Sequence, residues 1–326
     1  MSAIRVVRCS VGSESYAFRI TDVRSIHRRE EMLAGAKLGV GVVGTLPGST
    51  GTLPVYALAR QFGLPEPSAR SGGQILTFGD GGSAWGLAVD QVSRVLEIPS
   101  GEVLPLPRLA GELSGMLFEG VLKVEEALVL LVASTALDLV PALDPGAAYP
   151  GPAEEEVQAV SRPARAETRA ARTSAGRILV FSTRKGDGGE AKTSYALSLR
   201  QVAEVTEARP STRVPFAPPH VLGLIPWRER TIPVVDVAMR LGLDRSDAGA
   251  ARLLVARSTR EEGAEVAFPI PADAKQQSVP VLPPASETDP RLDLGAVLGV
   301  FSLDSLGSLG LGDLIVPDLE RIVSTG

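Results

Sequence analysis

The chain repeats itself at one fixed offset, and this repeat limits the possible folds more than any other feature of the sequence. Identical residues recur 179 positions apart over about forty positions without a gap. A self-match at constant offset indicates a duplicated structural unit. The identical pairs are Tyr16 and Tyr195, Ala17 and Ala196, Thr52 and Thr231, Pro54 and Pro233, Val55 and Val234, Ala59 and Ala238, Gly63 and Gly242, and Leu64 and Leu243.

Each copy reads as a series of short strands separated by Gly, Pro and Asp turns, with few helical patterns. This pattern predicts an all-β fold, either a sandwich or small barrels. The strands expected in the first copy cover 4–11, 16–23, 74–78, 85–90 and 120–131. Those expected in the second copy cover 177–182, 195–205, 253–256, 266–273 and 298–316.

The two copies are predicted to fold as separate modules, 1–140 and 177–326, joined by a flexible linker. The segment between them, 141–176, is rich in Pro, Ala, Glu and Arg. Such a composition buries too little apolar surface to offset the entropy lost on ordering.

The most informative stretch is 221–243, VLGLIPWRERTIPVVDVAMRLGL. It predicts a strand, a charged hairpin tip, a second strand, and a helical turn that ends at Gly242. We expect Trp227 and Arg228 to be exposed at the tip, where an indole and a guanidinium can bind another protein. Arg230 belongs to the same candidate tip, with simple solvation as its alternative.

The charge and the apolar patterning of the chain exclude several classes of protein. A net charge of −5 and a pI near 5.3 argue against nucleic-acid binding, which needs a concentrated basic face. Cys9 is the single cysteine, so no disulfide forms within the chain and a cytoplasmic location is expected. No signal peptide is recognised, and the longest apolar run, 127–140, is interrupted by polar residues, so no direct membrane insertion is expected.

An enzymatic function has little support in the sequence. The chain has two histidines, His27 and His220, and it shows no nucleotide-binding, nucleophile-elbow or zinc-protease motif. We therefore predict no catalytic residue, cofactor or metal site, and a structural role for His220. The alternative is an enzyme with an unrecognised carboxylate pair, for example Asp90 and Asp236, although Asp90 is expected to accept backbone N–H bonds in a turn.

Two stretches resemble the CheW-like chemotaxis coupling proteins. The first is WGLAVDQVSRVLEIP in the first copy, and the second is the hairpin described above. The hairpin departs from the family pattern, because Glu229 stands where the family has a glycine and Pro226 where it has a polar residue. The matching residues are Gly86, Val89, Asp90, Val92, Val95, Ile98, Gly223, Trp227, Arg228, Ile232, Pro233, Val234, Asp236 and Val237.

The resemblance implies a fold and a function. It implies two tandem modules, each a pair of small five-stranded SH3-like barrels, in a non-catalytic adaptor that couples chemoreceptors to a CheA-type histidine kinase. The implied partners are the kinase regulatory domain and the cytoplasmic tip of the receptor. The alternative is a divergent CheW-like scaffold in another pathway, such as control of motility or development.

The resemblance also assigns Arg228 and Glu204 as candidate partner-binding residues, with simple solvation as the alternative for each. Together with Trp227 and Arg230 at the hairpin tip they complete the candidate set, all in the second module. In the first module Ser25 stands in the position of Glu204 and Ala57 in that of Asp236. Its tip, GTLPGSTG at 44–51, has neither an aromatic residue nor an arginine. We therefore expect the first module to be structural or to bind a different partner.

Overall fold

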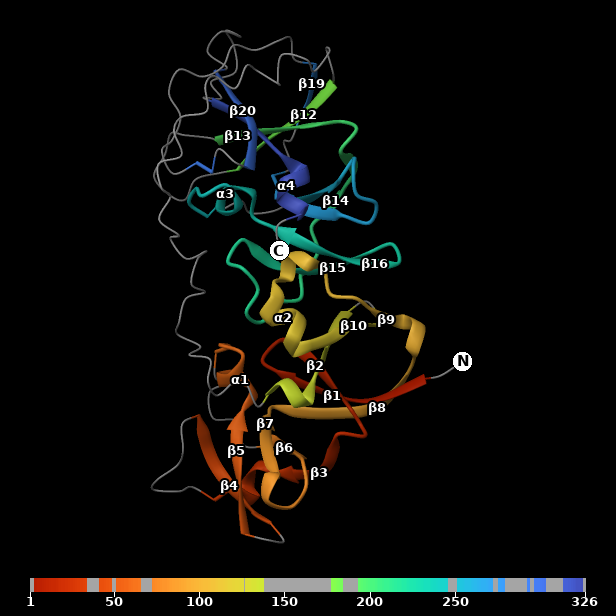
Figure 1. Cartoon of the computed structure of the whole chain (residues 1–326), viewed down its shortest axis with the longest axis vertical. Coiled ribbons are helices and arrows are strands. Elements are labelled where there is room, and N and C mark those ends of the chain that lie inside the picture. Colours follow the sequence, from red (N-terminus) through yellow and green to blue (C-terminus); the bar gives the residue numbers. More distant parts are fainter. Residues whose placement is uncertain are drawn as a thin grey trace. The chain divides into compact units, whose positions relative to one another are not determined.

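A computed structural model of the chain describes most of both halves (Figure 1). The predicted linker 141–176 and the predicted turn residue Asp273 lie outside this part. The described residues are 3–33, 41–48, 51–65, 72–125, 127–137, 177–183, 193–245, 251–271, 275–278, 292–293, 296–302 and 313–324.

The chain divides into two compact units, and each unit consists of three separate segments of the sequence. Unit 1 comprises Met1–Gly151 together with two short segments of the second half, Thr212–Ala217 and Pro226–Thr231. Unit 2 comprises the remainder. Two segments from the second copy therefore pack with the first one.

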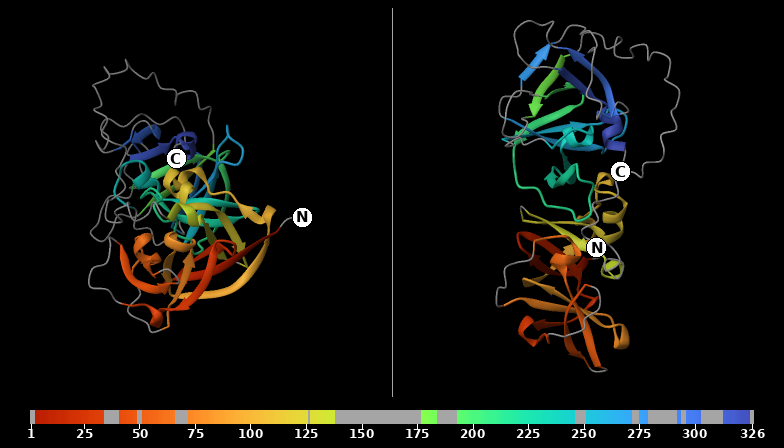
Figure 2. Two further views of the ribbon diagram at one scale, coloured as in Figure 1. Left: turned by 60° about the horizontal axis from the view of Figure 1, so that its bottom comes forward. Right: turned by 90° about the vertical axis from the view of Figure 1, so that its left-hand side faces the viewer.

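Unit 1 contains two antiparallel-rich sheets with strong twist (Figure 2). The six-stranded sheet has the order β8-β1-β2-β11-β10-β9, and the five-stranded sheet has the order β3-β6-β7-β5-β4. The strands are β1 (Ala3–Val11), β2 (Glu14–Arg19), β3 (Val23–Arg28), β4 (Val42–Gly48), β5 (Gly51–Ala57), β6 (Gln74–Phe78), β7 (Trp85–Val89), β8 (Gln91–Pro99), β9 (Val103–Leu104), β10 (Phe118–Val124) and β11 (Ala127–Val132). The helices are α1 (Leu58–Gln61) and α2 (Glu112–Leu117), with short 3₁₀ turns η1 (Arg29–Glu31), η2 (Gly81–Ser83), η3 (Ser100–Glu102) and η4 (Arg108–Ala110).

The second half of the chain also forms two sheets, each with five strands. Their orders are β19-β12-β13-β21-β20 and β14-β17-β18-β16-β15. The strands are β12 (Arg177–Thr183), β13 (Thr193–Ser198), β14 (Val202–Glu207), β15 (Val221–Trp227), β16 (Arg230–Val235), β17 (Arg252–Arg257), β18 (Glu265–Ile270), β19 (Lys275–Ser278), β20 (Val297–Ser302) and β21 (Asp313–Pro317). The helices are α3 (Val237–Arg240) and α4 (Leu319–Ser324).

The duplication predicted from the sequence is reproduced in the topology. Strand orders β3-β6-β7-β5-β4 and β14-β17-β18-β16-β15 correspond strand by strand, and β8-β1-β2-β11-β10 corresponds to β19-β12-β13-β21-β20. Even irregularities recur, because a β-bulge lies between Val23 and Ser25 and another between Val202 and Glu204. The all-β prediction and the pair of small sheets in each copy are confirmed.

Four predicted strands are wrong in their extent. The segment 298–316 contains two strands, β20 and β21, which pair antiparallel with each other. The segments 16–23 and 195–205 each divide into two strands, because a tight turn at Ile20–Asp22 and at Leu199–Gln201 passes the chain from one sheet to the next. The segment 120–131 is the hairpin β10–β11, whose turn includes Glu125 at φ +58°. Polar residues mark the first two turns, Thr21 and Asp22 in one and Arg200 and Gln201 in the other, but each was read as part of one strand.

The core is mostly aliphatic, and one buried aromatic ring occupies the same place in both copies. Tyr16 and Tyr195 are fully buried. In unit 1 the ring of Phe62 lies 5.1 Å from Tyr16 and 5.5 Å from Phe118, centroid to centroid. Within the described part no helix is both long and apolar enough to cross a membrane.

Candidate partner-binding surface

The hairpin β15–β16 carries three of the four candidate binding residues. Trp227 is the last residue of β15 and Arg230 the first of β16, so the turn itself consists of Arg228 and Glu229. The helical turn predicted after the hairpin is α3, and Gly242 follows it with φ +81°, as a glycine C-cap requires.

The expectation that Trp227 is exposed is wrong. Its side chain is only 9% exposed. The physical reason is that the tip segment Pro226–Thr231 packs within unit 1, where the Thr231 hydroxyl donates to the carbonyl of Pro105 at 3.2 Å. The indole therefore fills an intramolecular contact and is not open to a partner.

Arg228, by contrast, is exposed, and so are Glu229 and Arg230. The guanidinium carbon of Arg228 lies 4.3 Å from the centroid of the Trp227 ring, a cation–π contact. The positive φ of the turn, +54°, falls on Arg228, and Glu229 does not adopt one. Glu229 is therefore compatible with this turn, although the family has glycine there.

The sequence did not predict that a second segment of the second copy packs with unit 1. The loop Thr212–Ala217 precedes the hairpin and belongs to unit 1. The buried hydroxyl of Ser114 donates to the carbonyl of Pro215 at 2.8 Å, and the ring of Phe216 packs edge-on to Phe62 at 6.4 Å. The run VPFAPP, apolar and rich in proline, was the available signal.

Glu204 lies on β14, at the edge of its sheet, and is half-buried. Its neighbour on the strand, Val205, is 41% exposed. Because an edge strand of a small sheet covers little core, both of its faces retain contact with solvent. Glu204 therefore lies on an open edge, in unit 2, whereas the other three candidates belong to unit 1.

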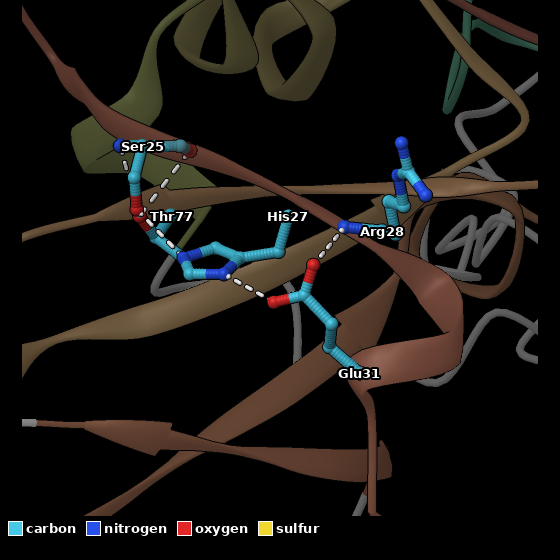
Figure 3. A network of polar contacts seen from close by, with 5 residues as sticks. All are labelled: Ser25, His27, Arg28, Glu31 and Thr77. Carbon is cyan, nitrogen blue, oxygen red and sulfur yellow. Dashed lines mark hydrogen bonds and ion pairs between the residues drawn. The ribbon is translucent and has the colours of Figure 1, made fainter.

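The equivalent edge of the first copy, β3, carries a network of polar contacts (Figure 3). Ser25 Oγ lies 2.8 Å from His27 Nε2 and 2.6 Å from Thr77 Oγ1. The other ring nitrogen, Nδ1, lies 3.0 Å from Glu31 Oε2. Glu31 Oε1 accepts the backbone N–H of Arg28, and these bonds lower the pKa of the Glu31 carboxyl, that from His27 most of all.

The two carboxylates of the enzyme alternative each accept hydrogen bonds from the backbone. Asp90 Oδ2 accepts the N–H of Gly12 at 2.7 Å, which confirms its predicted role in a turn. Asp236 is buried and caps α3, with Oδ1 accepting from Ala238 N at 3.0 Å and Met239 N at 3.2 Å. Within the described ranges no group of three or more His, Cys, Asp or Glu side chains could hold a metal ion.

His220 is largely enclosed, as a structural role requires. Its Nε2 atom is buried and has no hydrogen-bond partner among the described residues. Burial, together with the nearby charge of Arg240, lowers the pKa of His220 to about 4. The imidazole is therefore neutral in the folded protein near neutral pH.

Comparisons with known proteins identify the family of the chain. A model of the CheW-like domain matches residues 5–138 and 188–324. A probable chemotaxis protein CheW of Rhizobium etli is 23% identical over 110 residues, which cover 34% of this chain and 71% of that protein. The scaffolding protein TtCheW of Thermoanaerobacter tengcongensis is 20% identical, with a TM-score of 0.36 over 40% of this chain and 90% of its own. Because the domain model matches most of both halves of the chain, this protein belongs to the CheW-like family and contains the domain twice.

Proposed function

We propose that the chain is a scaffold that couples chemoreceptors to a CheA-type histidine kinase. The observation that carries the proposal is the pair of CheW-like domains, which together span most of the chain. The family is one of non-catalytic chemotaxis scaffolds, which supports an adaptor and not an enzyme. The proposed location is the cytoplasm, with membrane association only through the receptors.

Exposed charges of the second domain are the proposed contacts with the kinase regulatory domain and the receptor tip. Arg228 and Arg230 are exposed on the hairpin, and Glu204 lies on the β14 edge. Trp227 contributes indirectly, because its buried ring makes a cation–π contact that positions the Arg228 guanidinium. Such charges at the rim of an interface set orientation and specificity, while buried apolar area supplies most of the affinity.

The first domain lacks this set of side chains, so the two domains have different roles. Ser25 replaces Glu204, and its hydroxyl is tied to His27 and Thr77. The second domain therefore makes the kinase contact, and the first supports the scaffold or binds a different partner. Two binding modules on one chain raise avidity where both sites are engaged together.

The test is a binding assay of the full chain against the regulatory domain of a CheA-type kinase. We expect the Arg228→Glu variant to bind at least about tenfold more weakly, because reversal of an exposed rim charge replaces attraction by repulsion. The matched control is Arg94→Glu, which reverses an exposed arginine on β8. Unchanged binding of Arg228→Glu removes Arg228 from the contact surface, and absence of binding by the unmodified chain rejects the coupling function.

A further inference from the structure

Two strands, β3 and β14, occupy the same edge position in the equivalent sheets of the two copies. Within the described residues β3 pairs only with β6, and β14 pairs only with β17. An edge strand presents a row of N–H and C=O groups that can pair with another strand. The chain therefore has two structurally equivalent edges available for pairing.

Each of these edges exposes one large aliphatic side chain, and the two occupy the same position in the repeat. Ile26 on β3 is 47% exposed and Val205 on β14 is 41% exposed. Aliphatic side chains opposite one another on neighbouring strands stabilise the pairing of those strands. An apolar contact is therefore possible at the centre of a β3–β14 pair.

The charges of the two strands are of opposite sign. The sequence of β3, VRSIHR, contains Arg24 and Arg28 and no acid, whereas that of β14, VAEVTE, contains Glu204 and Glu207 and no base. These charges oppose the pairing of like strands, since β3 with β3 sets arginine near arginine and β14 with β14 sets glutamate near glutamate.

The acidic side chains near β3 do not remove its basic character. Glu31 accepts from His27 and from the backbone of Arg28, and Figure 3 shows the Arg28 side chain directed away from this network. Arg24 pairs with Asp80 at 2.6 Å, with the two side chains 56% and 77% exposed. An ion pair so open to water is weak, so Arg24 can exchange Asp80 for another carboxylate at little cost.

We propose that β3 of one chain pairs with β14 of a second copy of this chain, so that copies associate head to tail. In the antiparallel register that sets Ile26 opposite Val205, Arg24 lies opposite Glu207 and His27 opposite Glu204. Because the contact joins two different surfaces, it generates a linear or ring assembly and not a two-fold dimer. The duplication gives the chain two equivalent edge strands, β3 and β14. Because β3 is basic and β14 is acidic, the two edges are complementary in charge.

The first test measures the mass of the full chain by sedimentation velocity over a wide range of concentration, without kinase or receptor. We expect the average mass to rise past that of a dimer, and added salt to reduce it. Arg24→Glu with Arg28→Glu, and separately Glu204→Arg with Glu207→Arg, are each expected to weaken association about tenfold. Arg5→Glu with Arg94→Glu is the matched control, since both arginines are exposed on the other sheet of unit 1.

The second test mixes the two charge-reversed variants, after thermal melts have shown that both are folded. Two copies of the same variant repel each other, because both of their edges then carry the same sign of charge. An edge of one variant is complementary to an edge of the other variant, so the mixture is expected to regain the mass of the unmodified protein. Arg28→Glu alone, which leaves the Arg24–Asp80 pair intact and lies opposite Ala203 in this register, is expected to weaken association less than the double reversal. A monomer at every concentration, an assembly indifferent to the reversals, or a mixture that stays monomeric overturns the proposal.

Discussion

The guanidinium of Arg228 lies 4.3 Å from the centroid of the Trp227 ring, so an exposed charge rests on a buried indole. The two residues were expected to act alike, as one exposed tip. Their environments differ instead, because the indole packs inside unit 1 while the guanidinium remains in contact with solvent. Substitutions at these neighbouring positions should therefore separate stability from binding.

Trp227→Ala is expected to destabilise the protein by about 3 kcal/mol, because it removes a large buried ring and leaves a cavity. Arg228→Ala removes an exposed guanidinium that makes a cation–π contact, and it is expected to cost about 0.5–1 kcal/mol. The measurement is urea unfolding followed by circular dichroism. Equal, small losses for both variants would show that the indole is not packed as the structure has it.

Arg228→Gly is expected to be about 1 kcal/mol more stable than Arg228→Ala. Both variants remove the guanidinium, so the difference between them isolates the backbone, which has φ +54° at this position. Glycine adopts that conformation without the steric cost borne by a residue with a Cβ. The same pair of substitutions at Glu229, which has no positive φ, provides the control and should favour glycine less.

Much of the fold could be predicted because each repeated sequence feature marks the same structural element in both copies. The repeated Pro-Val and Gly-Leu pairs mark a strand and a glycine-capped turn, and the structure has β5 with α1 and β16 with α3 at these places. Strand ends were harder to predict. The turn at Ile20–Asp22 moves the chain to another sheet, and its polar pair Thr21-Asp22 is too short a signal to separate two strands from one.

The candidate site could be predicted only in part, because burial is a property of tertiary packing. The sequence indicates the hairpin and its charged turn, and both are present. That the loop 212–217 and the tip 226–231 pack with the first copy depends on contacts between residues more than a hundred positions apart, such as Ser114 with Pro215. The sequence repeat predicts the elements within each copy, but it does not predict contacts between segments of different copies.

The N-caps of the two equivalent helical turns provide a reciprocal prediction. Asp236 caps α3 with its side chain, whereas Ala57, at the N-cap of α1, has no side-chain cap. Asp236→Ala is expected to cost about 1–2 kcal/mol, and Ala57→Asp to gain about 0.5–1 kcal/mol, since the backbone at both positions is extended. Thermal unfolding of both variants checks this. A loss of stability in Ala57→Asp would show that the α1 turn does not accept a cap.

The stability of unit 2 should depend on pH through His220. Burial, with a contribution from the charge of Arg240, lowers the pKa of this histidine from 6.5 to about 4 in the folded chain. Between these two values the unfolded chain binds a proton that the folded chain does not bind, so stability falls as the pH falls. Above pH 6.5 the histidine is neutral in both states and contributes no pH dependence.

His220→Gln replaces the titrating ring by a neutral polar side chain and tests this dependence directly. Relative to the variant, the unmodified protein is expected to lose about 1–2 kcal/mol of unfolding free energy as the pH falls from 6.5 to 4. Because carboxylates such as Glu320 titrate equally in both proteins, the difference between the two curves isolates His220. Urea unfolding at a series of pH values measures it. Parallel curves over this range would show that the folded and unfolded chains bind the His220 proton equally, and would contradict the buried, neutral ring.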